Sequence, residues 1–404
     1  WRFSVVGSCT TKKISRICRS VTCEGSNASF TTSACPVRPV VTEHSISGGI
    51  SQFYYRGSTK YDATLAPPVP GLKFDQISLT GVDQSSLVTN LDLTWRIRSP
   101  GADSKFVVRD ILTNNYLQGQ DDTNRLYAMY YEHQAADASY LGRFGRQPGY
   151  TGGMLGRFDG AWAGYTVAPG LRLNAVVGSP VEFYAAQPKH FVGINTDIGP
   201  VAERWNGNLF FVQQESEGVL DRRAVGGELR YFDARANLFS LVDYDIAFSA
   251  LNIAMLQGSV TLESGATWTL LLDHRRVPVL QTTNVLIGES TTIPGLLTPS
   301  LPQLVQAGRS EADLRAGASA LTPVSDLFLI GYTQPVTPTL QLGGDFRISS
   351  VSGTSASGNL PAAPGTGNVY VYTVQAIKTG VFAERDTGVV SLSLIDGMTY
   401  NGQS

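Results

Sequence analysis

The chain has few charged residues, and this shortage narrows its class. Charged side chains make up 16% of the 404 residues, whereas a typical soluble domain has about 25%. The net charge of −2 lacks the basic excess that a nucleic-acid-binding surface needs. We therefore expect no nucleic-acid partner, and we expect much uncharged surface to face something other than water.

Long apolar runs are missing as well. A membrane-spanning helix needs about 20 consecutive apolar residues, and the most apolar stretch, 237–262, is interrupted by Asp243, Asp245 and Gln257. The other structure that satisfies every backbone N–H and C=O group inside hydrocarbon is a closed β-barrel. A chain with 42 Gly, 17 Tyr and little charge is typical of such a barrel.

Cysteine is scarce, and all four cysteines lie near the N-terminus: Cys9, Cys18, Cys23 and Cys35. In an oxidising compartment they would form two disulfides, with three possible pairings that the sequence leaves open. A zinc site is the weaker alternative, because there is no Cys-x-x-Cys pair and no histidine among them. We expect no metal or cofactor, and we interpret residues 1–40 as a small, β-rich, cysteine-containing segment.

From about residue 45 onward, apolar and polar residues alternate in segments of about ten. The clearest segment is 89–98, and 171–178 and 340–349 repeat its pattern. In 89–98, one face carries the apolar side chains Leu91, Leu93, Trp95 and Ile97. Because side chains of a strand point alternately to its two faces, one face suits lipid and the other suits water. The sequence therefore predicts an all-β fold, a transmembrane antiparallel β-barrel over residues 41–404.

The connections between these segments alternate in length. Short turns are expected at 99–104, 168–170, 234–236, 263–265 and 335–338. Longer links are expected at 118–123, 180–188, 277–325 and 351–367. A soluble β-sandwich is the alternative, but it has no reason to sort its loops, whereas a membrane barrel has short periplasmic turns and long external loops. We therefore place residues 1–40 in the periplasm and interpret 277–325 as an extracellular loop or plug.

About seventeen strand segments can be counted up to Leu394. Bacterial single-chain barrels use even numbers of strands, and the sequence begins at Trp1 without Met. We therefore interpret the chain as a fragment of a longer protein, whose barrel is incomplete at the C-terminus and has 18 or more strands in full.

The polar positions of the predicted strands are rich in arginine and in acidic residues. A charge on the lipid face at mid-membrane costs about 2–4 kcal/mol, so we expect these side chains to line the lumen. The candidates are Asp92, Arg96, Arg98, Arg143, Arg146, Arg157, Arg172, Arg222, Glu228, Arg230, Asp243, Asp245, Asp273, Asp345 and Arg347. They would either form a selectivity lining or pair across neighbouring strands to hold the wall in shape.

Catalytic signatures are absent from the sequence, so we do not expect an enzyme. There is no G-x-S-x-G and no H-E-x-x-H motif, and the chain has only 4 His. Asp273 and His274 are adjacent, so a strand would place them on opposite faces. A hydrolase would need a Ser or Asp within hydrogen-bond reach of His133, His190 or His274 at a barrel rim.

Several stretches resemble porin-like outer-membrane proteins of proteobacteria. They are 141–147 (LGRFGRQ), 152–160 (GGMLGRFDG), 171–176 (LRLNAV), 220–232 (LDRRAVGGELRYF) and 270–276 (LLLDHRR). In particular, residues 80–404 are similar to the barrel portion of large proteins that carry tetratricopeptide repeats upstream in the periplasm. The resemblance implies an outer-membrane location in contact with lipid. Other proteins with this layout export polysaccharides.

Two functions follow as expectations. The first is a channel that passes a small hydrophilic solute or an exported polysaccharide through an arginine-rich lumen. The second is a non-conducting barrel that anchors a surface or periplasmic assembly, with residues 1–40 contacting the protein partner.

Overall fold

The computed structural model describes most of the chain in two compact units, Trp1–Pro148 and Gly149–Ser404. The described residues are 2–4, 21–23, 30–32, 42–65, 75–149, 153, 156–181, 187–289 and 299–397. Cys9, Cys18 and Cys35 lie outside them, as does the side chain of Cys23, so the expected disulfides concern residues that the structure does not describe. No helix within the described ranges is long and apolar enough to cross a membrane.

The first unit is an antiparallel sheet in which each long strand pairs with the next one along the chain. Its long strands are β4 (Glu43–Leu65), β5 (Asp75–Arg98), β6 (Ala102–Asn115), β7 (Thr123–Ala135) and β8 (Tyr140–Pro148). The short strand β1 (Arg2–Ser4) pairs with β4, and β2 (Val21–Cys23) forms a separate hairpin with β3 (Phe30–Thr32). The N-terminal segment therefore contains strands, and one of them extends the edge of this sheet.

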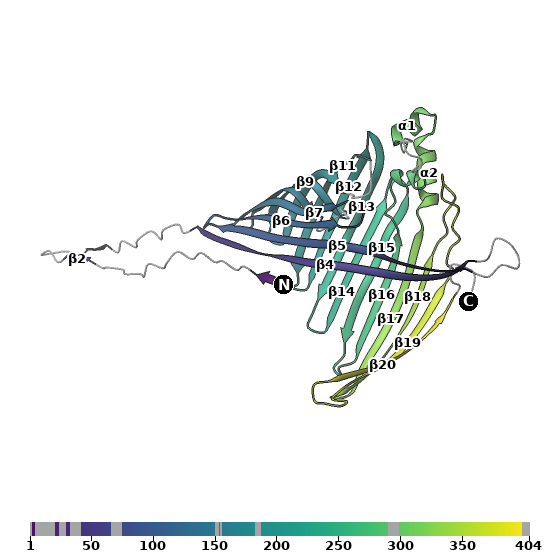
Figure 1. Ribbon diagram of the computed structural model, residues 1–404. Helices are drawn as coiled ribbons and strands as arrows, with labels where there is room; N and C mark the ends of the chain where they lie inside the picture. The colour runs from purple at the N-terminus through teal and green to yellow at the C-terminus, as the bar shows by residue number, and fades with distance from the viewer. Residues whose placement is uncertain are drawn as a thin grey trace. The chain divides into compact units, whose positions relative to one another are not determined.

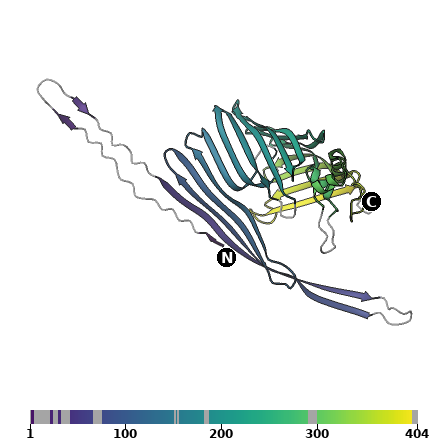
Figure 2. The same ribbon diagram turned by 90° about the horizontal axis from the view of Figure 1, so that it is seen from above.

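The second unit continues the same pattern through twelve strands, β9 to β20 (Figures 1 and 2). They are β9 (Arg157–Ala168), β10 (Leu171–Pro180), β11 (Lys189–Val201), β12 (Trp205–Ser216), β13 (Val219–Phe232), β14 (Ala236–Asp245), β15 (Ala250–Thr261), β16 (Thr267–Arg276), β17 (Val324–Thr337), β18 (Leu340–Val351), β19 (Val369–Thr379) and β20 (Thr387–Asp396). With β4 to β8, the described chain has seventeen long strands. The predicted antiparallel all-β fold with about seventeen strands is confirmed.

In both units, apolar strand residues are often exposed where their polar neighbours are buried. On β11 and β12, Ile194 and Leu209 are 62% and 59% exposed, whereas Asn195 and Asn208 are 3% and 4% exposed. On β8, Phe144 is 71% exposed and the adjacent Arg143 only 7%. This distribution is the reverse of that in a soluble protein. Each sheet therefore has an exposed apolar face, and an opposite face that carries its polar residues, many of them buried.

Most connections of the second unit are sorted by length, with two short turns at the end that carries the long connections. At one end of its strands the chain turns within a few residues, as at 169–170 and 338–339. At the other end lie the longer connections 181–188, 277–323 and 352–368. The turns 217–218 and 246–249 also lie at this second end, although they are short.

Those two short turns lie beneath the helices of the long connection. Between β16 and β17 the chain forms a 3-10 turn, η1 (Thr282–Leu286), and two helices, α1 (Leu301–Gln306) and α2 (Glu311–Leu321). Leu301, Leu314 and Ala318 are fully buried in an apolar cluster that includes Val219 at the start of β13, with Phe248 packed against it. A longer turn at either place would occupy the space that the helices fill.

Candidate functional site

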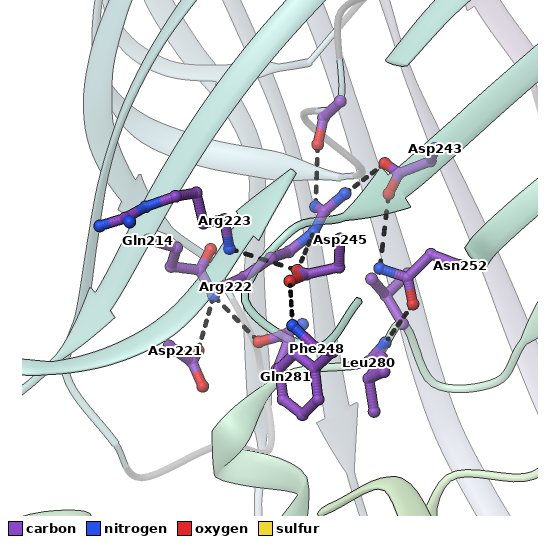
Figure 3. Close-up of polar contacts among 12 residues, drawn as sticks. Gln214, Asp221, Arg222, Arg223, Asp243, Asp245, Phe248, Asn252, Leu280 and Gln281 are labelled. Carbon is purple, nitrogen blue, oxygen red and sulfur yellow. Dashed lines mark hydrogen bonds and ion pairs between the residues drawn. The ribbon is translucent and has the colours of Figure 1, made fainter. Parts of the chain in front are cut away.

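A network of buried charges occupies the polar face of β13 and β14 (Figure 3). The two-residue period of β13 places Arg222 on this face, where it is 5% exposed. Its guanidinium forms an ion pair with Asp243, and its Nε lies 4.0 Å from Asp245 Oδ2. Its Nη1 donates to the carbonyl oxygen of Gly153 at 3.1 Å. A buried arginine is tolerated only with such partners, because a lone buried charge is strongly destabilising.

The two carboxylates of this network also accept hydrogen bonds from other groups. Asp245 accepts from the backbone N–H groups of Arg223 at 3.2 Å and Phe248 at 3.1 Å. Asp243 accepts from the Asn252 amide at 3.4 Å. A register shift between β14 and β15 at Asp243 accompanies the inward position of Asn252. The network therefore fixes the β14–β15 turn as well as the arginine.

The long connection folds onto this polar face before it reaches its helices. The Leu280 N–H donates to Asn252 Oδ1 at 3.1 Å, and the Thr283 N–H donates to Asp221 Oδ1 at 2.7 Å. Thr282 Oγ1 donates to the carbonyl oxygen of Leu220 at 2.8 Å. Leu280, Thr282 and Asp221 are fully buried, so the start of the connection is anchored against the strands.

Two glutamines and a lysine complete this attachment. Gln281 Oε1 accepts from Lys189 Nζ at 3.0 Å and from Gln214 Nε2 at 2.9 Å. Gln214 Nε2 also donates to Asp221 Oδ2 at 2.8 Å. Lys189, on β11, lies 4.0 Å from the same carboxylate. Side chains from β11 and β12 therefore converge on Gln281, and Asp221 of β13 holds Thr283.

The remaining charges that we expected on the polar face of the second unit are partly paired. Arg230 pairs with Glu228 at 2.6 Å, and its guanidinium lies 5.5 Å from the Phe239 ring centroid. Arg275 pairs with Asp273 at 2.6 Å. Arg172 Nε lies 3.4 Å from Thr166 Oγ1.

Two further candidates, Asp345 and Arg347, share the polar face of β18. Arg347 is exposed. Neither side chain forms an ion pair with another residue of the described chain.

The polar face of the first unit carries a similar ladder. Arg143 pairs with Glu132, which also accepts from Lys105 Nζ at 2.7 Å. Asp103 pairs with both Arg96 and Arg98. Asp92 pairs with Arg109 at 3.2 Å. For these groups the structure supports the second of the two alternatives, in which opposite charges pair across neighbouring strands.

We expected Arg146 to line the lumen, but the structure places it on the other face of its strand. The register places Arg146 opposite Met129 and therefore on the apolar face with Phe144. The reason is the strand period: Arg143 and Arg146 are three residues apart, so an uninterrupted strand cannot direct both to the same face. The Arg146 guanidinium donates to the carbonyl oxygen of Leu126 at 3.3 Å.

Sequence reasoning missed five residues of the site: Lys189, Gln214, Asp221, Asn252 and Gln281. Lys189 and Gln214 could have been found from the two-residue period, because they alternate with exposed residues on β11 and β12. Asn252 and Gln281 carry no such signal, since a register shift and an irregular connection position them.

All three histidines that a hydrolase would use have a nearby hydroxyl or carboxylate group. Nδ1 of His133 lies 2.8 Å from Ser104 Oγ, and Nδ1 of His190 lies 2.8 Å from Ser179 Oγ. His274 lies 2.7 Å from Asp326. Within the described chain, none of these contacts joins a serine, a histidine and an acid in one row as acyl transfer by a triad requires.

Comparison with known proteins gives structural likenesses only. No protein-family model and no curated protein matches the sequence. The outer membrane protein OprD from Pseudomonas aeruginosa is similar at 11% identity, with 89% of this chain and 90% of that chain covered and a TM-score of 0.41. The outer membrane protein opdK from the same species has 14% identity, coverages of 88% and 94%, and a TM-score of 0.41. OccAB4 from Acinetobacter baumannii has 8% identity, coverages of 85% and 93%, and a TM-score of 0.37.

Proposed function

We propose that this chain forms the wall of an outer-membrane β-barrel and that a hydrophilic solute passes along its polar face. The observation that carries the proposal is the reversed distribution of polarity, as in Phe144 at 71% and Arg143 at 7% exposure. A continuous exposed apolar face is stable only against lipid or another apolar partner. A sheet surrounded by lipid must also close, because an open edge would leave backbone groups without partners.

The solute path along the polar face would be narrowest at the anchored start of the β16–β17 connection. Leu280 and Gln281 lie on the polar face and are held there by Asn252, Lys189 and Gln214. In a closed barrel such a segment would project into the lumen and reduce its free cross-section. The longer connections would then face the outside of the cell, and the short turns the periplasm.

Planar-bilayer recording tests the channel. The refolded protein is expected to produce discrete conductance steps. Ion selectivity should be weak, because most polar-face charges that we can place are paired with opposite charges. A folded protein that inserts into bilayers without any conductance step would contradict the proposal.

A non-conducting anchor is the second candidate, and the same connection is the observation that favours it. The start of the connection is fully buried at Leu280 and Thr282. A connection attached in this way could block the lumen completely. A silent barrel in the bilayer experiment would support the anchor over the channel.

A further inference from the structure

The polar face offers mostly neutral hydrogen-bonding groups to a passing solute. Its arginines are largely neutralised, as in the pairs of Arg222 with Asp243 and Arg275 with Asp273. Between them lie uncharged amides and hydroxyls, including Asn195, Asn237, Ser259 and Gln375. Such a surface suits a solute whose own polar groups are neutral.

A cavity opens on this face beside the anchored connection. Its volume is about 70 Å³ without the space at its open mouth, and Phe158, Phe191 and Val212 form an apolar wall. The two phenylalanine rings meet edge to face, with centroids 5.2 Å apart. Gln214, Gln281, Arg157 and Arg222 supply its polar side chains. The cavity therefore combines an apolar wall with several fixed polar groups, the two kinds of surface that orient a bound small molecule.

Among the described residues, the amide of Gln281 keeps a donor without a partner, and the amide of Gln214 keeps an acceptor without one. Gln281 Oε1 accepts from Lys189, which can only donate, so Gln281 Nε2 is the other end of the amide. Gln214 Nε2 donates to the Asp221 carboxylate, which can only accept, so Gln214 Oε1 is its other end. In the part of the chain that is described, neither Gln281 Nε2 nor Gln214 Oε1 has a hydrogen-bond partner.

A hydroxyl group both donates and accepts a hydrogen bond, and therefore matches this pair. A carboxylate only accepts, and would leave Gln214 Oε1 without a donor. We propose, on the basis of the channel function above, that this cavity is a subsite for an uncharged saccharide unit, with its hydroxyls on the two glutamines and its C–H face on the phenylalanine wall.

Calorimetric titration of the folded protein in detergent with maltotriose tests the subsite directly. Saturable binding is expected for the wild type. Gln281→Glu keeps the oxygen that accepts from Lys189 and Gln214 but removes the amide donor, so we expect about tenfold weaker binding, as for the loss of one good hydrogen bond. Gln257→Glu makes the same change on the polar face outside the cavity and should leave binding unchanged.

Two results would overturn the subsite: no maltotriose binding by the wild type, or tighter binding of tri-galacturonate, an acidic sugar of equal length. The bilayer recordings separate this failure from that of the channel. Conductance steps without maltotriose binding leave the channel and remove the subsite, whereas binding without conductance keeps the saccharide site and removes transport.

Discussion

Each buried charged side chain of the described chain has a nearby partner of opposite charge, which makes its burial tolerable. Arg222 and Asp243 are 5% and 1% exposed, and Asp245 is fully buried beside them. Removing one member of such a set leaves an uncompensated buried charge, which costs more than the pair contributes.

Arg222→Leu should therefore destabilise the protein by about 3–5 kcal/mol, because it leaves two acidic side chains without their cation. Urea unfolding of the refolded protein in detergent measures this change. Arg347→Leu is the matched control, since Arg347 is exposed and no ion pair of the described chain involves it, and it should cost less than about 0.5 kcal/mol. Equal losses in the two variants would contradict the assigned role of the Arg222 pairs.

The turn between β19 and β20 contains a carboxylate whose protonation we expect to loosen it. The pKa of Asp386 is lowered; partial desolvation acts to raise it, but the hydrogen bonds from the Phe382, Val381 and Ala383 N–H groups outweigh this effect. Because the folded pKa is the lower one, this stabilisation is present above the unfolded pKa and is lost as pH falls through the folded pKa.

Amide chemical shifts of Val381 and Phe382, followed by NMR in detergent from about pH 6 to about pH 2, should therefore show an acid transition. Asp386→Asn should abolish it. A transition that persists in this variant would assign the pH response to another group.

At the scale of elements, the β16–β17 connection combines an anchored start with a helical end. Asp221 binds the Thr283 N–H at 2.7 Å, whereas the helices pack in the apolar cluster of Leu301 and Leu314, to which Val285 and Leu286 of η1 also belong. Helix α2 also has its own N-terminal cap, in which Ser310 Oγ accepts from the Asp313 N–H. A change on the strand side should therefore affect the start of the connection more than α2.

Asp221→Ala removes the acceptor of the Thr283 N–H and should loosen η1 at Thr283, while α2 keeps its N-terminal cap. The loss of one buried hydrogen bond, about 1–3 kcal/mol, predicts roughly 10- to 100-fold faster amide exchange at Thr283. Hydrogen-exchange mass spectrometry over 279–286 measures this rate, with 311–321 as the internal reference. Faster exchange in both segments would show that the connection opens as one unit.

At the scale of the whole molecule, the apolar and polar faces of the strands suit different environments. On β19, Val374 is 59% exposed on the apolar face, and its neighbour Gln375 lies on the polar face. Adjacent residues therefore report on the two environments.

Val374→Arg should destabilise the protein in lipid vesicles by about 2–4 kcal/mol, because the charge enters the hydrocarbon region. Gln375→Arg introduces the same side chain one residue later and should cost less than about 1 kcal/mol. Unfolding of both variants in vesicles provides the comparison, and similar costs would argue against a lipid-facing surface.

The strands were predictable because alternation is a local property of the sequence. Leu91, Leu93, Trp95 and Ile97 share a face in β5, and their pairing with β4 and β6 follows from the order of the strands. Residue type alone did not predict the face of Arg146. An arginine in a strand was expected to face the lumen, but its spacing from Arg143 placed it on the other face.

The sequence by itself determined the strand number and the two faces of the strands, because a period of two acts between neighbouring residues. The tertiary structure alone decided which charges pair, where the 277–323 connection attaches and which glutamine atoms stay free. Those features depend on residues distant in sequence, such as Gln214 and Gln281, and a local pattern contains no information about a contact that only folding creates.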